Sequence, residues 1–353
     1  MIRFLRRVFG PPWRVLKAVG APIMRFLVRF QAIVVPVIAL LLAFSIGAVL
    51  IRLQGVDPAY AYQSLFRGAL FTSDGLLRTL QKATPLILTG LAVVIPLRTG
   101  LFNIGAQGQL IFGALGAAWV GAGWRGLPAY LLIPLALLAG IVFGAFWAWI
   151  AGFLKAKRNV HEVISTIMLN SIALGIIDYL VTGPMREPGQ ELPRTAEIAP
   201  AAMIPDIGLV PIGFPVAVLL ACGIWWMLGR TTTGFRFNTV GKNRFAASYA
   251  GINISRVVVA GMMLSGGLAG FGGAIETLGI THRYESAFNA GLGFDGITIA
   301  LLARSNPLGT IPAAFLVGML RAGASTLQFD TGIQPEVVDM LLAITLLFVS
   351  IPL

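Results

Sequence analysis

A glycine-rich polar segment without charged residues is the part of the chain whose side chains best suit ligand binding. It reads Thr-Gly-Leu-Phe-Asn-Ile-Gly-Ala-Gln-Gly-Gln over residues 99–109 and lies between two strongly apolar runs. Its amide side chains can hydrogen-bond a neutral polar solute at a lower desolvation cost than a buried charge carries. Inside a bilayer, such a segment is tolerated only within protein or beside a wet cavity. Interrupted apolar spans of this kind point to a transport pathway.

The spacing of the amides indicates which of them face that pathway. Asn103 and Gln107 are four residues apart and would share a helical face. Gln107 and Gln109 are two residues apart, so on a helix they point about 200° away from each other. We therefore predict that Asn103 and Gln107 line the pathway and that Gln109 packs against a neighbouring span. The alternative is that these amides only hold the broken backbone in place.

Further polar residues fall in or next to apolar runs, where polar groups are expensive and commonly face a cavity or a partner. Glu276 sits near the outer end of its run, so interfacial snorkelling is the alternative for that side chain. The residues added to the predicted pathway are Asn170, Glu276 and Asn306.

The composition predicts the fold class that must position these residues. The chain has 353 residues, of which 57% are hydrophobic and 11% are charged, and its mean hydropathy is +0.85. Soluble domains carry about 25% charged residues. The expected fold is therefore an all-α, polytopic transmembrane helix bundle. A transmembrane β-barrel is excluded because the apolar runs are continuous, whereas barrel strands alternate.

A helix needs about 20 mostly apolar residues to cross a bilayer, and the chain contains a series of apolar runs of about this length or shorter. This predicts about ten spans, with short or broken helices among them, at residues 32–51, 85–97, 105–121, 129–154, 163–182, 213–229, 257–279, 296–303, 309–327 and 337–352. Residues 32–353 form the predicted transmembrane domain. Residues 1–31 are basic and interleaved with apolar side chains, which predicts an amphipathic arm on the cytoplasmic face.

The charge distribution orients the chain. A net charge of +12 and a pI near 10.7 could indicate nucleic-acid binding, but cytoplasmic loops collect Lys and Arg for topological reasons. With the N-terminus inside, most basic residues fall on the inner side and nearly all acidic residues on the outer side. We therefore expect cytoplasmic N- and C-termini and no nucleic-acid partner. A proline-rich loop at 183–211 is then external, and a basic, proline-free loop at 230–256 is cytoplasmic.

The sequence lacks the residue combinations that are typical of metal sites and nucleotide-binding sites in enzymes. The two histidines, His161 and His282, fall on opposite sides of the membrane, so no shared metal site is expected. The sequence has no Walker A motif, and its two literal G-x-G-x-x-G matches, at 121–126 and 291–296, lie in turns between spans. We expect no cofactor and no covalent chemistry. A membrane-embedded transferase is disfavoured, and an ion-driven secondary carrier would require titratable groups at mid-span.

A weak internal echo relates two short runs. Residues 90–98 and 296–304 each begin with Gly and end with Arg, and each precedes a polar turn that contains Asn and Gly. Duplicated broken helices are common in transporters. Chance similarity between apolar stretches is also common, so the echo alone decides little.

Several ordered motifs resemble a known family. They are the Thr-Pro-Leu-Ile-Leu-Thr-Gly-Leu-Ala run at 84–92 and the segments 98–110, 162–170, 234–252, 264–279 and 294–318. Together they resemble permeases of ATP-binding cassette (ABC) importers of the branched-chain amino acid and simple sugar type, and most closely those of nucleoside importers. The resemblance covers residues 80–350. One departure is Gln107, where many relatives carry an acid, which favours an uncharged pathway.

The resemblance implies a multi-pass permease of a prokaryotic plasma membrane that moves its solute by alternating access. It implies three kinds of protein partner: ATP-binding cassette subunits that hydrolyse ATP, a second permease subunit (a paralogue or another copy), and an extracytoplasmic substrate-binding protein. It also implies a cytoplasmic coupling segment that touches the ATPase, matched here by Gly241, Lys242, Asn243, Ala247, Tyr249 and Gly251. Nucleosides are the expected small-molecule solute, with simple sugars, riboflavin or branched-chain amino acids as alternatives.

Overall fold

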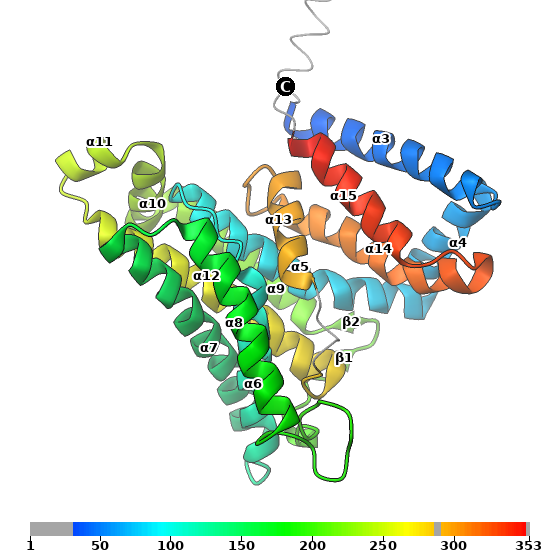
Figure 1. Ribbon diagram of the computed structural model, residues 1–353, viewed down its shortest axis with the longest axis horizontal. Coiled ribbons are helices and arrows are strands. Elements are labelled where there is room, and N and C mark those ends of the chain that lie inside the picture. Colours follow the sequence, from blue (N-terminus) through cyan, green and yellow to red (C-terminus); the bar gives the residue numbers. More distant parts are fainter. Residues whose placement is uncertain (1–30, 286–290, 351–353) are drawn as a thin grey trace, which may run out of the picture.

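The computed structural model describes residues 31–285 and 291–350, which form a bundle of α-helices (Figure 1). The helices are α3 (Gln31–Leu53), α4 (Pro58–Leu70), α5 (Ser73–Arg98), α6 (Ala106–Gly123), α7 (Ala129–Arg158), α8 (Glu162–Thr182), α9 (Gly213–Arg230), α10 (Thr232–Lys242), α11 (Arg244–Tyr249), α12 (Ile254–Glu276), α13 (Leu292–Leu302), α14 (Thr310–Thr331) and α15 (Glu336–Ser350). A short antiparallel hairpin pairs β1 (Asp206–Ile207) with β2 (Val210–Pro211). The expected all-α bundle is confirmed. The arm predicted for residues 1–31 lies outside the described residues, except for Gln31.

Six of the described helices are long and apolar enough to cross a membrane, namely α5, α7, α8, α9, α14 and α12 with its π-helical extension η2 (Thr277–Thr281). A seventh span results if α3 and α4, bent by 116° at their junction, are counted as one. The estimate of about ten spans is therefore approximate. α13 has 11 residues, too few to cross a bilayer alone, which agrees with the expected short or broken helices.

The sequence analysis missed α4, which it left without an element. Asp57 caps this helix by accepting a hydrogen bond from the Ala59 amide at 3.3 Å, and Pro58 occupies its first turn. Both features are standard signals for a helix start. α4 packs on α14, where Gly68 faces Thr326. Polar residues along α4 keep it from registering as an apolar run.

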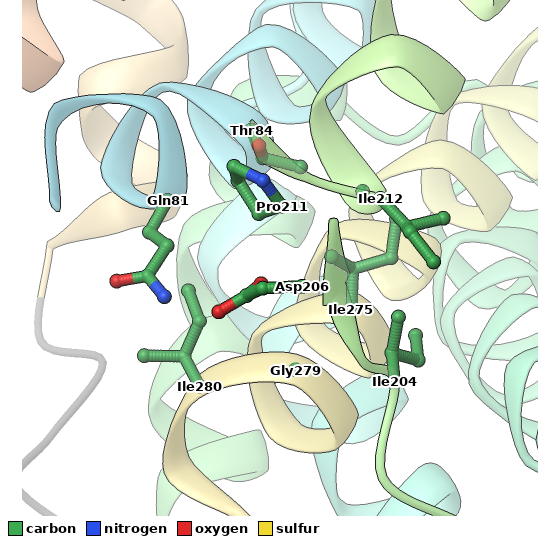
Figure 2. A pocket seen from close by; sticks show the side chains of 10 residues that line it. Gln81, Thr84, Ile204, Asp206, Pro211, Ile212, Ile275, Gly279 and Ile280 are labelled. Atoms are coloured by element: carbon green, nitrogen blue, oxygen red, sulfur yellow. The ribbon is translucent and has the colours of Figure 1, made fainter. Parts of the chain in front are cut away.

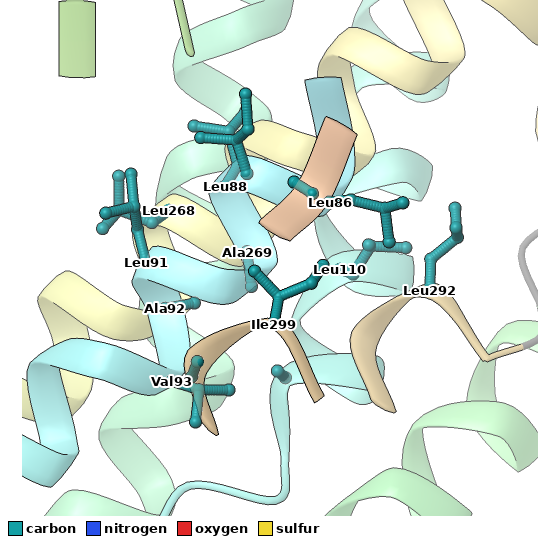
Figure 3. Close-up of a cluster of buried hydrophobic side chains, with 14 of the residues drawn as sticks. Leu86, Leu88, Leu91, Ala92, Val93, Leu110, Leu268, Ala269, Leu292 and Ile299 are labelled. Atoms are coloured by element: carbon teal, nitrogen blue, oxygen red, sulfur yellow. The ribbon is translucent and has the colours of Figure 1, made fainter. Parts of the chain in front are cut away.

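α5 forms the centre of the bundle. Every residue from Ala83 to Pro96 is buried, and α12, α13 and α14 all pack on this helix. Figure 3 shows the apolar cluster at this centre, with Leu88 and Leu91 of α5 near Leu268 of α12 and Ile299 of α13. Only about a third or less of α7, α8 and α9 is buried within the bundle, which leaves apolar faces for the bilayer or for partner subunits.

Glycines set the spacing between α6, α7 and α12. A β-carbon at Gly113 of α6 would collide with the backbone of Gly270 of α12, and one at Gly270 would collide with the carbonyl oxygen of Gly140 of α7. Lipid tails are as apolar as the side chains they would replace, so helices in a membrane associate through close packing of this kind. The glycines at 113, 140 and 270 therefore allow α6, α7 and α12 to pack with their backbones in near contact.

The two runs of the internal echo cross each other at their glycines. A β-carbon at Gly90 of α5 would lie 2.6 Å from Ile299 of α13, and one at Gly296 of α13 would lie 2.7 Å from the carbonyl oxygen of Thr89 of α5. Both helices then end in similar turns: the amide of Leu101 donates to the carbonyl five residues back, and so does the amide of Ser305.

Connections that the charge pattern assigns to the same side of the membrane meet in the structure. The outer loop 183–211 bonds to the region after α12, with the Ile198 amide donating to the His282 carbonyl and the Ile204 amide to the Leu278 carbonyl. On the other side, Ser255 donates to the carbonyl of Ala156. α10 and α11 project from that second side, at the upper left of Figure 1.

Replacing Gly270 with Ala should destabilise the bundle by about 1–3 kcal/mol, because the added methyl group overpacks the α7–α12 contact. Gly267→Ala is the matched control on the same helix, since its nearest neighbour would lie at an ordinary 3.4 Å. The measurement is the thermal denaturation of the detergent-solubilised protein, followed by size-exclusion chromatography. Equal melting temperatures for the two variants would contradict the close-packing interpretation.

Candidate functional site

The site begins with a backbone group that a proline leaves free. Pro96 lies inside α5 and has no N–H, so the carbonyl of Ala92 loses its usual helical partner. The hydroxyl of Ser265 on α12 donates to this carbonyl and replaces the missing bond. Ser265 and Ala92 are both buried. The carbonyl that Pro96 leaves free in α5 is thus bonded by a side chain of a neighbouring helix.

Asn103 extends this bond into a network. Its Nδ2 donates to Ser265 Oγ at 2.8 Å and to Gln109 Oε1 at 2.8 Å. Its Oδ1 accepts from the Gly105 amide at 2.9 Å and from Gln109 Nε2 at 3.1 Å. Asn103 is fully buried, and both the nitrogen and the oxygen of its side-chain amide are hydrogen-bonded. This one side chain therefore ties the non-helical segment before α6 to both α12 and α6.

Two more amides cap helices that begin inside the bundle. Asn170 of α8 accepts from the Gly108 amide at 2.9 Å and donates to the Ile104 carbonyl at 3.0 Å, which fixes the start of α6. Gln107 accepts from the Gly293 amide at 2.8 Å, which caps the start of α13. The first amides of a helix have no partner within the helix, so side chains must supply one here.

The pathway residues predicted from the sequence therefore come together in part. Asn103, Gln107 and Asn170 all gather where α6 and α13 begin, whereas Asn306 lies at the end of α13 and accepts from the Leu308 amide at 3.1 Å. Asn103 precedes α6, so the helical-face relation with Gln107 does not apply. In this conformation the amides serve backbone groups, and their place on a solute pathway stays a prediction.

Glu276 lies apart from these amides, at the C-terminal end of α12. Its carboxylate is fully buried and lies 3.7 Å from the ammonium of Lys82 on α5, which is 31% exposed. A buried charge is costly unless it is paired, so Lys82 offsets part of the cost of burying this carboxylate between α5 and α12. A small pocket lies nearby, lined in part by Gln81, Thr84 and Asp206 (Figure 2). Lys82 was missed in the sequence because it stands in a polar stretch before the apolar run.

Ion pairs also link the loop 183–211 to the segment that follows α12. Arg283 lies 3.3 Å from both Glu187 and Glu197, and Glu187 also pairs with Arg194 at 2.7 Å. The Tyr284 amide donates to Thr195 in the same layer. Burial, together with the nearby carboxylate of Asp178, raises the pKa of Tyr284 to about 12, so this phenol stays neutral at physiological pH. The loop 183–211 is therefore held against the segment that follows α12 by ion pairs and hydrogen bonds.

A second ion pair inside the bundle was also missed by the sequence analysis. Asp295 of α13 lies 2.6 Å from Arg321 of α14, which also reaches Asp339 of α15 at 3.2 Å. Arg321 interrupts an apolar helix, and a charge in such a position is expected to find a partner. The pair fixes the short helix α13 to its neighbours.

The coupling segment predicted over 230–256 contains α10 and α11. Tyr249 is 94% exposed and Phe245 is 82% exposed, so α11 carries two aromatic rings that no other described part of the bundle covers. Asn243 caps α11 by accepting from the Ala246 amide at 3.0 Å, and Gly251 follows α11 with a φ of +73°. Ala247, which the resemblance placed in the segment that touches the ATPase, is buried, so its side chain anchors α11 and is not exposed to a partner.

The comparisons with known proteins bear directly on this arrangement. A family model described as the permease component of branched-chain amino acid transport systems matches residues 75–350. The chain belongs to this family. The matched region of this permease runs from the start of α5 to the end of α15 and contains the whole amide network, α10 and α11.

Similar proteins support the same assignment. The guanosine ABC transporter permease protein NupP of Bacillus subtilis is 38% identical over 91% of this chain and 94% of its own length. The glucose ABC transporter permease protein TsgB13 of Haloferax volcanii is 37% identical over 89% of this chain and 86% of its own. The nucleoside ABC transporter permease protein NupB of Lactococcus lactis is 33% identical over 92% of each. No solved structure matches significantly.

These findings identify a multi-pass membrane permease and a transport subunit. The membrane-spanning helices agree with the family, because six of the described helices can cross a bilayer. The resemblance inferred from the motifs is thereby confirmed.

Asn103→Leu should lower the stability of the permease by about 2 kcal/mol or more, because it leaves several buried donors and acceptors without partners. Asn306→Leu, which removes a single bond at an exposed turn, should cost less than about 1 kcal/mol. The measurement is the melting temperature of each solubilised variant together with uptake per folded molecule. An Asn103→Leu variant of normal stability that has lost uptake would contradict the structural role and favour the pathway role.

Proposed function

We propose that this permease is the membrane-spanning subunit of an ATP-driven importer for nucleosides. The observation that carries the proposal is the similarity, over nearly the whole chain, to permeases named for guanosine and nucleosides. The chemistry of the α6–α13 junction is compatible with it, because amides and a hydroxyl meet there. A nucleoside is neutral and offers hydrogen-bond donors and acceptors, which amides can match.

The energy source in this proposal is ATP hydrolysed by separate ATP-binding cassette subunits. The sequence contains no Walker A motif, so the permease has no P-loop of its own. α10 and α11 project from the bundle with exposed aromatic rings at Phe245 and Tyr249, and aromatic side chains are enriched where proteins dock. We assign this surface to contact with the ATPase.

The solute pathway is proposed to run beside the junction where α6 and α13 begin. Transport sites in membrane proteins are commonly built at discontinuous helices near mid-membrane. The proposed pathway residues remain Asn103, Gln107, Asn170, Glu276 and Asn306. During alternating access, the amides would exchange some of their backbone partners for the solute, and donors and acceptors of the solute would bond the backbone groups that are freed.

The remaining partners follow from the same proposal. An extracytoplasmic binding protein would deliver the solute to the outer loop 183–211, and a second permease subunit would cover part of the exposed apolar faces of α7 to α9. Both termini are proposed to be cytoplasmic in a prokaryotic plasma membrane. The side that carries α10 and α11 is then the inner side.

Simple sugars are the second candidate solute, because the glucose permease TsgB13 is nearly as similar to this chain as NupP. A sugar is also neutral and would suit the same amides. The similarity to a probable riboflavin import permease of Treponema pallidum is lower, at 25% identity. A branched-chain amino acid carries two charges, for which the α6–α13 amides offer no charged partner.

Cells that express the assembled importer should take up labelled guanosine, and excess unlabelled nucleosides should compete while glucose and riboflavin should not. Uptake should continue when proton and sodium gradients are dissipated at constant ATP. Competition by glucose would favour the sugar permease. Loss of uptake together with the ion gradients would contradict an ATP-driven mechanism.

A cysteine at Tyr249 should crosslink to the ATP-binding subunit in the assembled complex, because this side chain is almost fully exposed on α11. The experiment uses a Cys222→Ala background, since Cys222 is the only native cysteine and is exposed. Ala247→Cys is the control, because position 247 is buried and should not react. Crosslinking at neither Tyr249 nor Asn243 would contradict the assigned docking surface.

A further inference from the structure

α10 meets the turn that follows α5 without any side chain between the two backbones. A β-carbon at Gly241 would collide with the carbonyl oxygen of Arg98 and lie 3.0 Å from the amide nitrogen of Gly100. In the other direction, a β-carbon at Gly100 would lie 3.1 Å from the α-carbon of Gly241. Gly100 also has a φ of +71°, a conformation that other residues rarely adopt. Glycine at both positions lets the coupling helix rest directly on the turn.

The same turn holds the end of α13. The guanidinium of Arg98 donates to the carbonyl of Ser305 through Nε at 3.1 Å and Nη2 at 2.8 Å. Ser305 and its neighbour Arg304 have φ values of +56° and +49°. Two consecutive non-glycine residues in the left-handed region are strained, and such strain persists only where the surroundings impose it. The two bonds from Arg98 are one such restraint.

The turn is joined to the amide network by residues that are buried or hydrogen-bonded. Thr99 is buried and lies against Gly261 of α12, where a β-carbon would be 3.2 Å from its methyl group. Leu101 is buried as well, and its amide bonds back to the Pro96 carbonyl at 2.9 Å. Asn103, with its bonds to Ser265 and Gln109, follows two residues later. No flexible linker separates Gly241 from the network.

We propose that the Arg98–Gly100 turn is a mechanical joint, in which Gly241, Gly100 and Arg98 act as positioning residues for transport. A displacement of α10 pushes on the backbone of this turn. The turn passes the movement to the segment before α6 through Leu101 and to the end of α13 through Ser305. As a result, α6 and α13 move together. This inference rests on the proposed function of α10 as the ATPase contact.

Contact between backbones explains why glycine is required at position 241. A side chain there would hold α10 away from the turn, and the two backbones would no longer be in direct contact. Packed backbone atoms have no such freedom, so a displacement is passed on almost undiminished. Gly241→Ala should therefore leave the ATPase able to dock and hydrolyse ATP while it weakens the link to the pathway.

The test compares Gly241→Ala with Gly229→Ala in the complete importer reconstituted into proteoliposomes. Position 229 lies near the same end of the bundle, in α9, and a β-carbon there meets no atom within 4 Å. The readout is solute transported per ATP hydrolysed, together with the Tyr249 crosslink as a measure of docking. For Gly241→Ala we expect this ratio to fall severalfold with crosslinking retained, because the added methyl group displaces α10 from the turn. Gly229→Ala should behave as wild type.

Arg98 provides a second test that leaves the α10 contact intact. Arg98→Gln removes the paired guanidinium bonds to Ser305 and should lower the transport ratio, whereas Arg98→Lys keeps a donor and should restore part of it. Wild-type ratios in both Gly241→Ala and Arg98→Gln would overturn the joint. Absence of ATP-dependent uptake in the wild-type complex would instead overturn the proposed function itself.

Discussion

A backbone group inside a bilayer has no water to bond with, and this constraint governs the centre of the permease. Pro96 frees the carbonyl of Ala92, and the starts of α6 and α13 expose further amides. Four polar side chains supply the missing partners, and each of them bonds to a freed backbone group or to another member of the network. They are Ser265, Asn103, Gln107 and Asn170. The polar residues at the centre are thus a direct consequence of breaking helices in an apolar solvent.

The same constraint explains why the helices must lie so close together. A hydroxyl or amide can reach a backbone group on a neighbouring helix only if the two helices nearly touch. Glycines at 113, 140 and 270 bring α6, α7 and α12 into such contact, and those at 90 and 296 do so for α5 and α13. Packing and hydrogen bonding are therefore interdependent: loss of a close contact would also leave polar groups unbonded, at a cost of about 1–3 kcal/mol each.

Much of the fold could be predicted from the sequence, because long apolar runs have one stable form in a membrane. The bounds of α7, α8 and α9 lie within a few residues of the predicted spans. The prediction failed where local signals misled: Pro85 suggested a broken run, but α5 continues through it from Ser73. α4 was missed because its polar residues hide it among loops, although its Asp-Pro start is a readable helix signal.

The site was predictable in type but not in its pairings. The polar break itself was visible, as were Asn103, Gln107 and Asn170, because uncharged polar residues stand out in apolar runs. The partners were not, since Ser265 lies 162 residues from Asn103 and Lys82 lies far from Glu276 in sequence. Only the folded bundle shows that Asn103 bonds to Gln109, a residue that the spacing alone placed against a different span.

The distribution of charge bears on what can pass through the permease. Among the described residues, the ion pairs of Lys82 with Glu276 and Lys155 with Glu162 stand toward opposite ends of the bundle. The helix starts at the junction are instead capped by amides, and Asp295, two residues beyond Gly293, is already neutralised by Arg321. A charged solute at this junction would lack a counter-charge and would bear the full desolvation cost. In the pathway proposed here, a neutral solute would need only an exchange of hydrogen bonds, which amides can accept or donate, so the same centre would favour uncharged polar molecules.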